Sequence, residues 1–333
     1  MRRRAFLALP AALLAAPLAK AREHATMRRI GFLFPNPRAK PEHRARDPGR
    51  LRLQALGSVE GENAVFEVAS ADGREERLAA LAAELVEKKV EVIWAAGPEA
   101  AVAAARATKT IPIVFYGVGY PIEQGLVDSL ARPGRNVTGL ASLSEADWSK
   151  RLELLREIAP GRVRLAWIAV ETVLVSVSGD RIRATRWGSI EAAAASFGFE
   201  LRRYAVSKRE DFDGVFTALP AAEPQALYCD FTALTFRERQ RIADFANHNR
   251  LPSAFGAAPF VEAGGLLSYG ANRMGMILDS FNHVDRILRG ARPEELPVEL
   301  PSRFELVINL GTAKALGLTV PQSILLRADR VIE

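Results

Sequence analysis

Short apolar segments alternate with amphipathic helical segments along most of the chain, and this alternation constrains the fold more than any other feature. Residues 90–95 and 163–170 are typical apolar runs of strand length, and such units occur both before and after residue 145. Strands that are apolar on both faces and are separated by helices indicate parallel sheets covered by helices on both sides. A length of 333 residues suits two domains. We therefore predict an α/β fold of two Rossmann-like, doubly wound lobes.

Local signals suggest where some of the helices begin. Residues 78–86 place leucines at helical spacing, and Asp72 with Glu75 has the spacing of an N-cap and its capping partner. We also expect a helix over residues 121–130. Ligands of parallel sheets bind at the carboxyl ends of the strands, and in a two-lobed protein the natural site lies between the lobes.

The N-terminus has the three parts of an export signal. Residues 1–4 are basic, residues 5–18 are apolar, and Ala19-Lys20-Ala21 places small residues at a cleavage site. We interpret residues 1–21 as a signal peptide; an N-terminal anchor or a buried helix is the alternative. Arg3-Arg4 also resembles a twin-arginine export signal. The expected location is the periplasm of a two-membrane bacterium.

Removal of this segment changes how the charge is interpreted. The whole chain carries a net charge of +6, which would favour a nucleic-acid partner. Residues 1–21 contain four basic and no acidic residues, so the processed chain has a net charge of only +2. We therefore expect no nucleic-acid partner.

The usual catalytic and cofactor motifs do not occur in the sequence. The turn after the first predicted strand has no glycine, and no Gly-x-Ser-x-Gly or phosphate-binding loop is found. None of the four histidines has a second ligand at metal-binding spacing. Cys229 is the single cysteine and is expected to be a small core residue on a buried strand. We expect no cofactor, no metal and no enzymatic activity.

Several segments, in the same order along the chain, resemble one bacterial family. The C-terminal stretch over residues 304–329, with Thr312-Ala313-Lys314-Ala315-Leu316-Gly317-Leu318, carries most of the resemblance. Residues 30–33, 111–115, 132–139 and 264–270 agree with it. The chain thereby resembles the substrate-binding proteins of ABC transporters that are related to tryptophan and aromatic amino-acid binding proteins.

The resemblance implies a type I periplasmic binding protein fold, in which two lobes close on a solute by hinge motion. The N-terminal lobe would comprise residues 28–143 plus 268–296, and the C-terminal lobe residues 144–267 plus 297–333. The implied partners are a small solute, such as an amino acid or related carboxylate, and the permease and ATPase of an importer, with the protein a monomer. The alternatives are a sensor that docks on a membrane receptor, or a periplasmic enzyme using Glu171 or Asp230.

The predicted strand ends supply the candidate ligand-binding residues. Asp230 is our choice to bind an ammonium group, with a helix N-cap role as the alternative. The helix that starts at Gly97-Pro98 could hold a carboxylate on its free N–H groups. Tyr116 could stack on an aromatic ligand, although core packing is the alternative for each aromatic residue. The full set is Asn36, Gly97, Pro98, Tyr116, Gly117, Thr138, Thr172, Asp230, Phe231, Phe255 and Tyr269.

Two loops depart from the family pattern. Residues 35–50 are rich in proline and arginine where family members usually have an amphipathic helix, and residues 171–178 lack the usual Asn/Pro-rich loop. Both loops are expected to face the ligand. Ligand identity is therefore the property that transfers least well from the resemblance.

Overall fold

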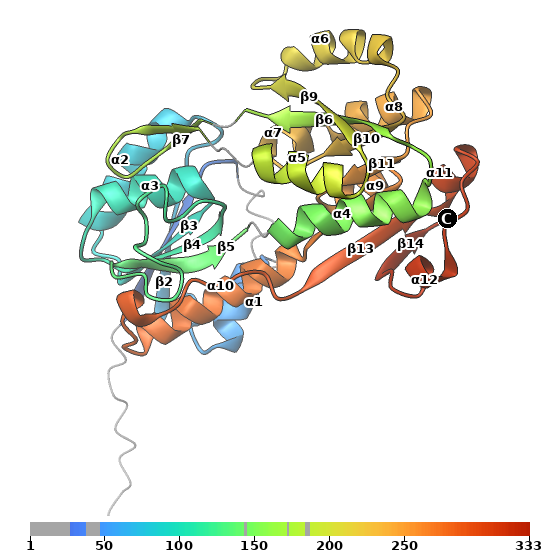
Figure 1. The fold of residues 1–333 in the computed structure, drawn as a ribbon. Coiled ribbons are helices and arrows are strands. Elements are labelled where there is room, and N and C mark those ends of the chain that lie inside the picture. The colour runs from blue at the N-terminus through green and yellow to red at the C-terminus, as the bar shows by residue number, and fades with distance from the viewer. Residues whose placement is uncertain (1–26, 38–46, 143–144, 172, 184–186) are drawn as a thin grey trace, which may run out of the picture.

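A computed structural model describes residues 27–37, 47–142, 145–171, 173–183 and 187–333 (Figure 1). The predicted signal peptide lies outside the described residues. The described part forms two α/β lobes, each built on its own sheet, which confirms the predicted fold class.

The first lobe has a five-stranded parallel sheet in the order β2-β1-β3-β4-β5. Its strands are apolar on both faces because helices cover both sides, as in Figure 1. Leu78, Leu81 and Leu85 bury one face of α2 against the sheet. The strands are β1 (Arg28–Phe34), β2 (Ala64–Ser70), β3 (Val92–Ala96), β4 (Ile113–Val118) and β5 (Val137–Ala141). The helices are α1 (Pro48–Ala55) and α10 (Arg273–Leu288) on one face, and α2 (Leu78–Glu87) and α3 (Pro98–Ala107) on the other.

The second lobe has a seven-stranded sheet in the order β14-β13-β12-β11-β10-β6-β9, in which only the β12–β13 pair is antiparallel. Helices again bury both faces. The strands are β6 (Arg164–Val170), β9 (Glu200–Val206), β10 (Ala226–Cys229), β11 (Ser253–Phe255), β12 (Leu267–Ala271), β13 (Phe304–Asn309) and β14 (Arg330–Ile332). The helices are α4 (Glu145–Ile158), α5 (Trp187–Ser196), α6 (Asp211–Ala218), α7 (Ala233–Arg237), α8 (Arg239–His248), α9 (Ala258–Glu262), α11 (Leu310–Ala315) and α12 (Gln322–Leu325).

Sheet membership moves two of the predicted lobe boundaries by a few residues. The boundary at 267/268 falls inside β12, whose residues pair with β11 and β13 of the second sheet, so the chain crosses over only after Ala271. On the return, Val298 still packs in the core of the first lobe, and the N–H of Glu299 donates to the Gly139 carbonyl at 3.0 Å. The second crossing therefore lies after Glu299 and not after residue 296.

Two local predictions were wrong. Residues 121–130 form successive turns instead of a helix, with Gly125 in the left-handed region at a φ of 69°. Asp72 has a φ of 55° and caps no helix; its carboxylate accepts from Ser70 and Arg77. The chain instead enters α2 through a short 3-10 turn, Glu75–Arg77. A left-handed conformation breaks the predicted helix at Gly125, and at Asp72 it replaces the extended backbone that an N-cap requires.

The atypical loop that follows β6 forms a two-stranded antiparallel hairpin, β7 (Val173–Val175) and β8 (Arg181–Arg183). Figure 1 shows the hairpin beside α2 and α3, away from the second lobe from which it starts. Its turn is hydrogen-bonded to the first lobe: the N–H of Val177 donates to the Gln124 carbonyl at 2.8 Å, and Arg106 donates to the carbonyls of Ser176 and Val177 at 2.6 and 3.1 Å. This segment therefore connects the two lobes.

Candidate ligand-binding site

The predicted residues of the first lobe lie together at the carboxyl end of its sheet. Asn36 follows β1, Gly97 and Pro98 follow β3, and Tyr116 and Gly117 lie near the end of β4. The N–H of Gly97 donates to the Tyr116 carbonyl at 2.8 Å, which joins the ends of β3 and β4. Gly97 has a φ of 87°, a conformation that favours glycine at this turn.

Tyr116 lies in the hydrophobic core of the first lobe at this edge. Its ring stacks on Trp94 at a centroid distance of 6.1 Å and an interplanar angle of 9°. The residue is 7% exposed, and its hydroxyl has no hydrogen-bond partner among the described residues. Burial raises the pKa of Tyr116, against the opposing effect of the nearby Arg273 cation, so the phenol stays protonated. An unpartnered buried hydroxyl is costly, and such groups are few in folded proteins.

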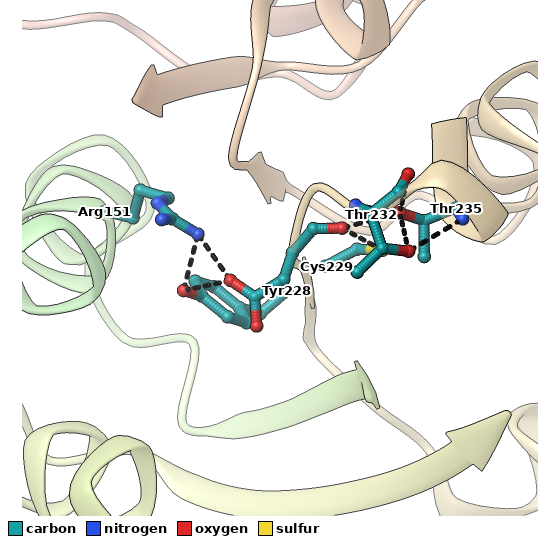
Figure 2. A network of polar contacts seen from close by, with 6 residues as sticks. Arg151, Tyr228, Cys229, Thr232 and Thr235 are labelled. Carbon is teal, nitrogen blue, oxygen red and sulfur yellow. Dashed lines mark hydrogen bonds and ion pairs between the residues drawn. The ribbon is translucent and has the colours of Figure 1, made fainter. Parts of the chain in front are cut away.

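The second lobe contributes a polar cluster at the end of β10, shown in Figure 2. Arg151 of α4 donates to the Asp230 carboxylate at 2.6 Å and to the Tyr228 hydroxyl at 2.8 Å. The Tyr228 hydroxyl lies 3.1 Å from the same Asp230 oxygen. Arg151 and Tyr228 are buried, and burial raises the pKa of Tyr228 well above its usual value, so Tyr228 is a hydrogen-bond donor here.

These contacts define what Asp230 can do. One carboxylate oxygen already accepts two hydrogen bonds, and the side chain is 25% exposed, which leaves the other oxygen available to a ligand. The alternative role as an N-cap is wrong, because the N-cap of α7 is Thr232, whose hydroxyl accepts from the Thr235 N–H at 3.1 Å (Figure 2). The Thr235 hydroxyl also donates to the Asp230 carbonyl at 2.8 Å and so holds the backbone at this point.

Arg273 is the residue of the site that sequence reasoning missed. It is the first residue of α10, directly after the N-cap Asn272. Its guanidinium carbon lies 4.1 Å from the centroid of the Phe231 ring and 5.7 Å from that of Tyr116. Since Phe231 belongs to the second lobe and Tyr116 to the first, this side chain contacts both lobes where the strand ends of the two sheets face each other. The sequence signal that could have found it is an Asn cap followed by a basic residue at the end of a predicted strand.

Other predicted residues are built into the lobes. Thr138 is fully buried, and its hydroxyl donates to the Leu296 carbonyl at 2.7 Å. Phe255 is also fully buried, with its ring stacked 4.8 Å from Phe260, which is the core-packing alternative. The Tyr269 ring stacks on Phe304 at 5.5 Å. No ligand can reach Thr138 or Phe255 without displacing core side chains. Thr172 lies outside the described residues.

The start of α3 suits a ligand carboxylate less well than predicted. Glu99 lies in the first turn of α3, and burial raises the pKa of its carboxyl group above the usual value. A Cβ added to Gly97 would lie only 3.5 Å from Glu99 Oε2. A carboxyl group of the protein therefore already lies close to this helix N-terminus and would compete with an external carboxylate for its free N–H groups.

A groove of about 490 Å³ lies between α2, α3 and the hairpin, in the size range of small-molecule sites. Leu78, Ala79, Ala83, Val102 and Ala103 are among its lining residues, together with Pro98. Glu75, Glu76 and Glu99 make it acidic, and its one lining arginine, Arg106, is hydrogen-bonded to the hairpin. The groove lies over α2 and α3 and reaches the end of β3 at Pro98, and its carboxylates disfavour anionic ligands.

Cys229 is fully buried in β10, as predicted, and burial raises the pKa of its thiol well above the usual value. Within the described ranges, no group of three or more His, Cys, Asp or Glu side chains is placed to hold a metal ion. No helix in the described part of the chain is long and apolar enough to span a membrane.

Two α/β lobes whose strand ends face each other across a set of aromatic and charged residues define the class of type I periplasmic binding proteins. More specifically, the chain belongs to the family of ABC transporter substrate binding proteins, whose profile matches residues 49–332. This confirms the resemblance seen in the sequence.

Individual proteins support this assignment. The chain is 26% identical over 266 residues to a tyrosine-binding protein of Clostridioides difficile, covering 80% of this chain and 74% of that protein. It is similar to a crystal structure of a conserved domain protein from Vibrio cholerae, with 27% identity, coverage of 92% of this chain and 100% of the other, and a TM-score of 0.77. A Streptococcus pneumoniae ABC domain in complex with L-Trp has the same fold, with 23% identity, a TM-score of 0.77 and the same coverage.

Proposed function

We propose that this protein is the exported solute-binding component of an ABC importer, and that it binds an amino acid, aromatic in our view, or a related carboxylate between its lobes. The observation that carries the proposal is that Tyr116 of one lobe and Phe231 of the other both lie against the guanidinium of Arg273, with Asp230 next to Phe231 in the sequence. The similarity to a tyrosine-binding protein and to a structure with bound L-Trp supports an aromatic ligand.

The mechanism follows from groups that belong to different lobes. A ligand that contacts Tyr116 and Phe231 together stabilises the arrangement in which the lobes are close, and the population shifts toward it. The closed protein then delivers the solute to a membrane permease driven by an ATPase. Because free hinge motion requires independent lobes, we take the protein to be a monomer.

Binding can be tested by thermal shift and calorimetry with L-tyrosine, L-tryptophan, L-phenylalanine and small aromatic carboxylates. A ligand at 100 times its Kd should stabilise the folded state by about 2.7 kcal/mol. Ala83→Trp is the matched control, because it fills the helical groove and leaves the strand ends unchanged. Unchanged binding by this variant locates the ligand outside the groove, whereas no stabilisation by any compound contradicts the proposal.

An enzyme or a sensor on the same fold would behave differently. Recovery of the bound compound chemically intact, measured by mass spectrometry, supports transport over turnover by Glu171 or Asp230. Direct binding of the loaded protein to a permease reconstituted with its ATPase, with stimulated ATP hydrolysis, supports the importer over a receptor-docking sensor.

The export route follows from the sequence of residues 1–21. We expect the protein recovered from the periplasm of an expressing two-membrane bacterium to begin at Arg22. Replacing Arg3-Arg4 by two lysines separates the routes, because only twin-arginine export should stop. An unprocessed N-terminus contradicts the export proposal.

A further inference from the structure

Arg273 is an exposed residue and has no charged partner within the described residues. Arg151 is paired with Asp230 at 2.6 Å, and Arg303 with Asp279 at 2.9 Å. Within the described residues, Arg273 makes no hydrogen bond or ion pair, and its recorded contacts are the rings of Phe231 and Tyr116. Its five N–H donors are therefore available in the plane of the guanidinium while aromatic faces support it.

The surroundings of Arg273 favour a negative ligand group. The residue starts a helix of 16 residues, whose N-terminus carries partial positive charge. Asn272 accepts from the Gly275 N–H at 2.7 Å, so the capping side chain is engaged and fixes the entry of the helix. Arg273 also contacts the Tyr116 ring, whose hydroxyl is a further donor. This residue is more than nine-tenths buried, and its hydroxyl has no partner in the described part of the chain.

A planar guanidinium matches a carboxylate through two parallel N–H···O bonds. The flanking rings are suited to an apolar or aromatic group on the same ligand. At the start of α3, the other predicted anion site, the Glu99 side chain lies close to Gly97. These observations predict how the ligand is oriented. Its anionic end binds Arg273, and its apolar part packs against Phe231 and Tyr116.

We propose that Arg273 binds the carboxylate of the transported solute and is the residue of the site that selects for this group. This inference rests on the proposed binding function. Arg273 belongs to α10, a helix of the first lobe, and it lies against Phe231 of the second lobe. A ligand that binds Arg273 and packs against Phe231 therefore contacts both lobes.

The test measures Kd by calorimetry for L-tryptophan, L-tyrosine and L-tryptophanamide, which replaces the carboxylate with a neutral amide of similar shape. The variants are Arg273→Met, Arg273→Lys and the control Arg289→Met, which removes an exposed cation from the other end of α10. We expect Arg273→Met to weaken amino-acid binding by about 10- to 100-fold, the loss of a charged hydrogen-bonded pair. Arg273→Lys should recover part of this loss, and Arg289→Met should bind normally.

Each outcome decides one of the two proposals. Wild-type protein that binds the amide as tightly as L-tryptophan overturns the carboxylate assignment, and so does Arg273→Met with amino-acid affinity equal to that of Arg289→Met. An amide that fails to bind the wild type supports the assignment. Wild-type protein that binds neither amino acid contradicts the proposed aromatic ligand itself, a result distinct from an effect of Arg273.

Discussion

The buried pair between Arg151 and Asp230 allows a quantitative prediction about the second lobe. Arg151→Met keeps much of the side-chain volume but leaves Asp230 without its cation and the Tyr228 hydroxyl with one partner fewer. Removing one member of a fully buried pair costs about 3–5 kcal/mol. The Asp230 side chain is 25% exposed and can recover some hydration, so we expect a loss of about 2–3 kcal/mol in the free energy of unfolding.

Urea denaturation, followed by the midpoint and the m value, measures this loss. The control is Arg330→Met, which removes a pair with Glu262 at 2.6 Å, whose side chains are 46% and 48% exposed, and a longer pair with Glu305 at 3.9 Å. That change should cost less than about 1 kcal/mol. The double variant Arg151→Met/Asp230→Asn should be more stable than Asp230→Asn alone, because it leaves no unpaired buried cation. If Arg151→Met costs no more than Arg330→Met, the pair does not stabilise the lobe.

Three further predictions concern packing, the hairpin and pH. Gly270→Ala should strongly destabilise the protein, because the added Cβ would lie 2.0 Å from the Gly256 carbonyl oxygen. A melting temperature close to that of the wild type contradicts this close packing of the two backbones. Arg106→Ala should release the β7–β8 hairpin, because it removes the hydrogen bonds to the Ser176 and Val177 carbonyls. Proteases should then cleave the hairpin faster while the melting temperature stays almost unchanged. An unchanged cleavage rate argues against this attachment. Burial raises the pKa of Tyr228 in the folded state. The free energy of unfolding should therefore fall as the pH rises above about 10, the pKa of tyrosine in the unfolded chain. Measured against pH by urea denaturation, this fall should be less steep in Tyr228→Phe.

The sequence by itself determined the fold class, and the reason is local. Strands buried on both faces must be apolar at nearly every position, so β3 and β10 could be read directly from their composition. The ends of such strands can also be located, which correctly brought Asn36, Gly97 and Tyr116 to one edge of the first sheet.

Only the tertiary structure decided which side chains at those ends face the opposite lobe. Thr138 and Phe255 occupy strand positions that look equivalent to the others, but the packing of neighbouring elements buries them completely. The pairing of β12 with β13 depends on residues almost 40 positions apart, so pattern alone could not place the lobe boundary. Arg273 belongs to no apolar pattern, and only the folded chain brings Phe231 and Tyr116, 115 positions apart in sequence, to the same guanidinium. Local composition defines strands and their ends, whereas the contacts between lobes depend on distances that no single segment encodes.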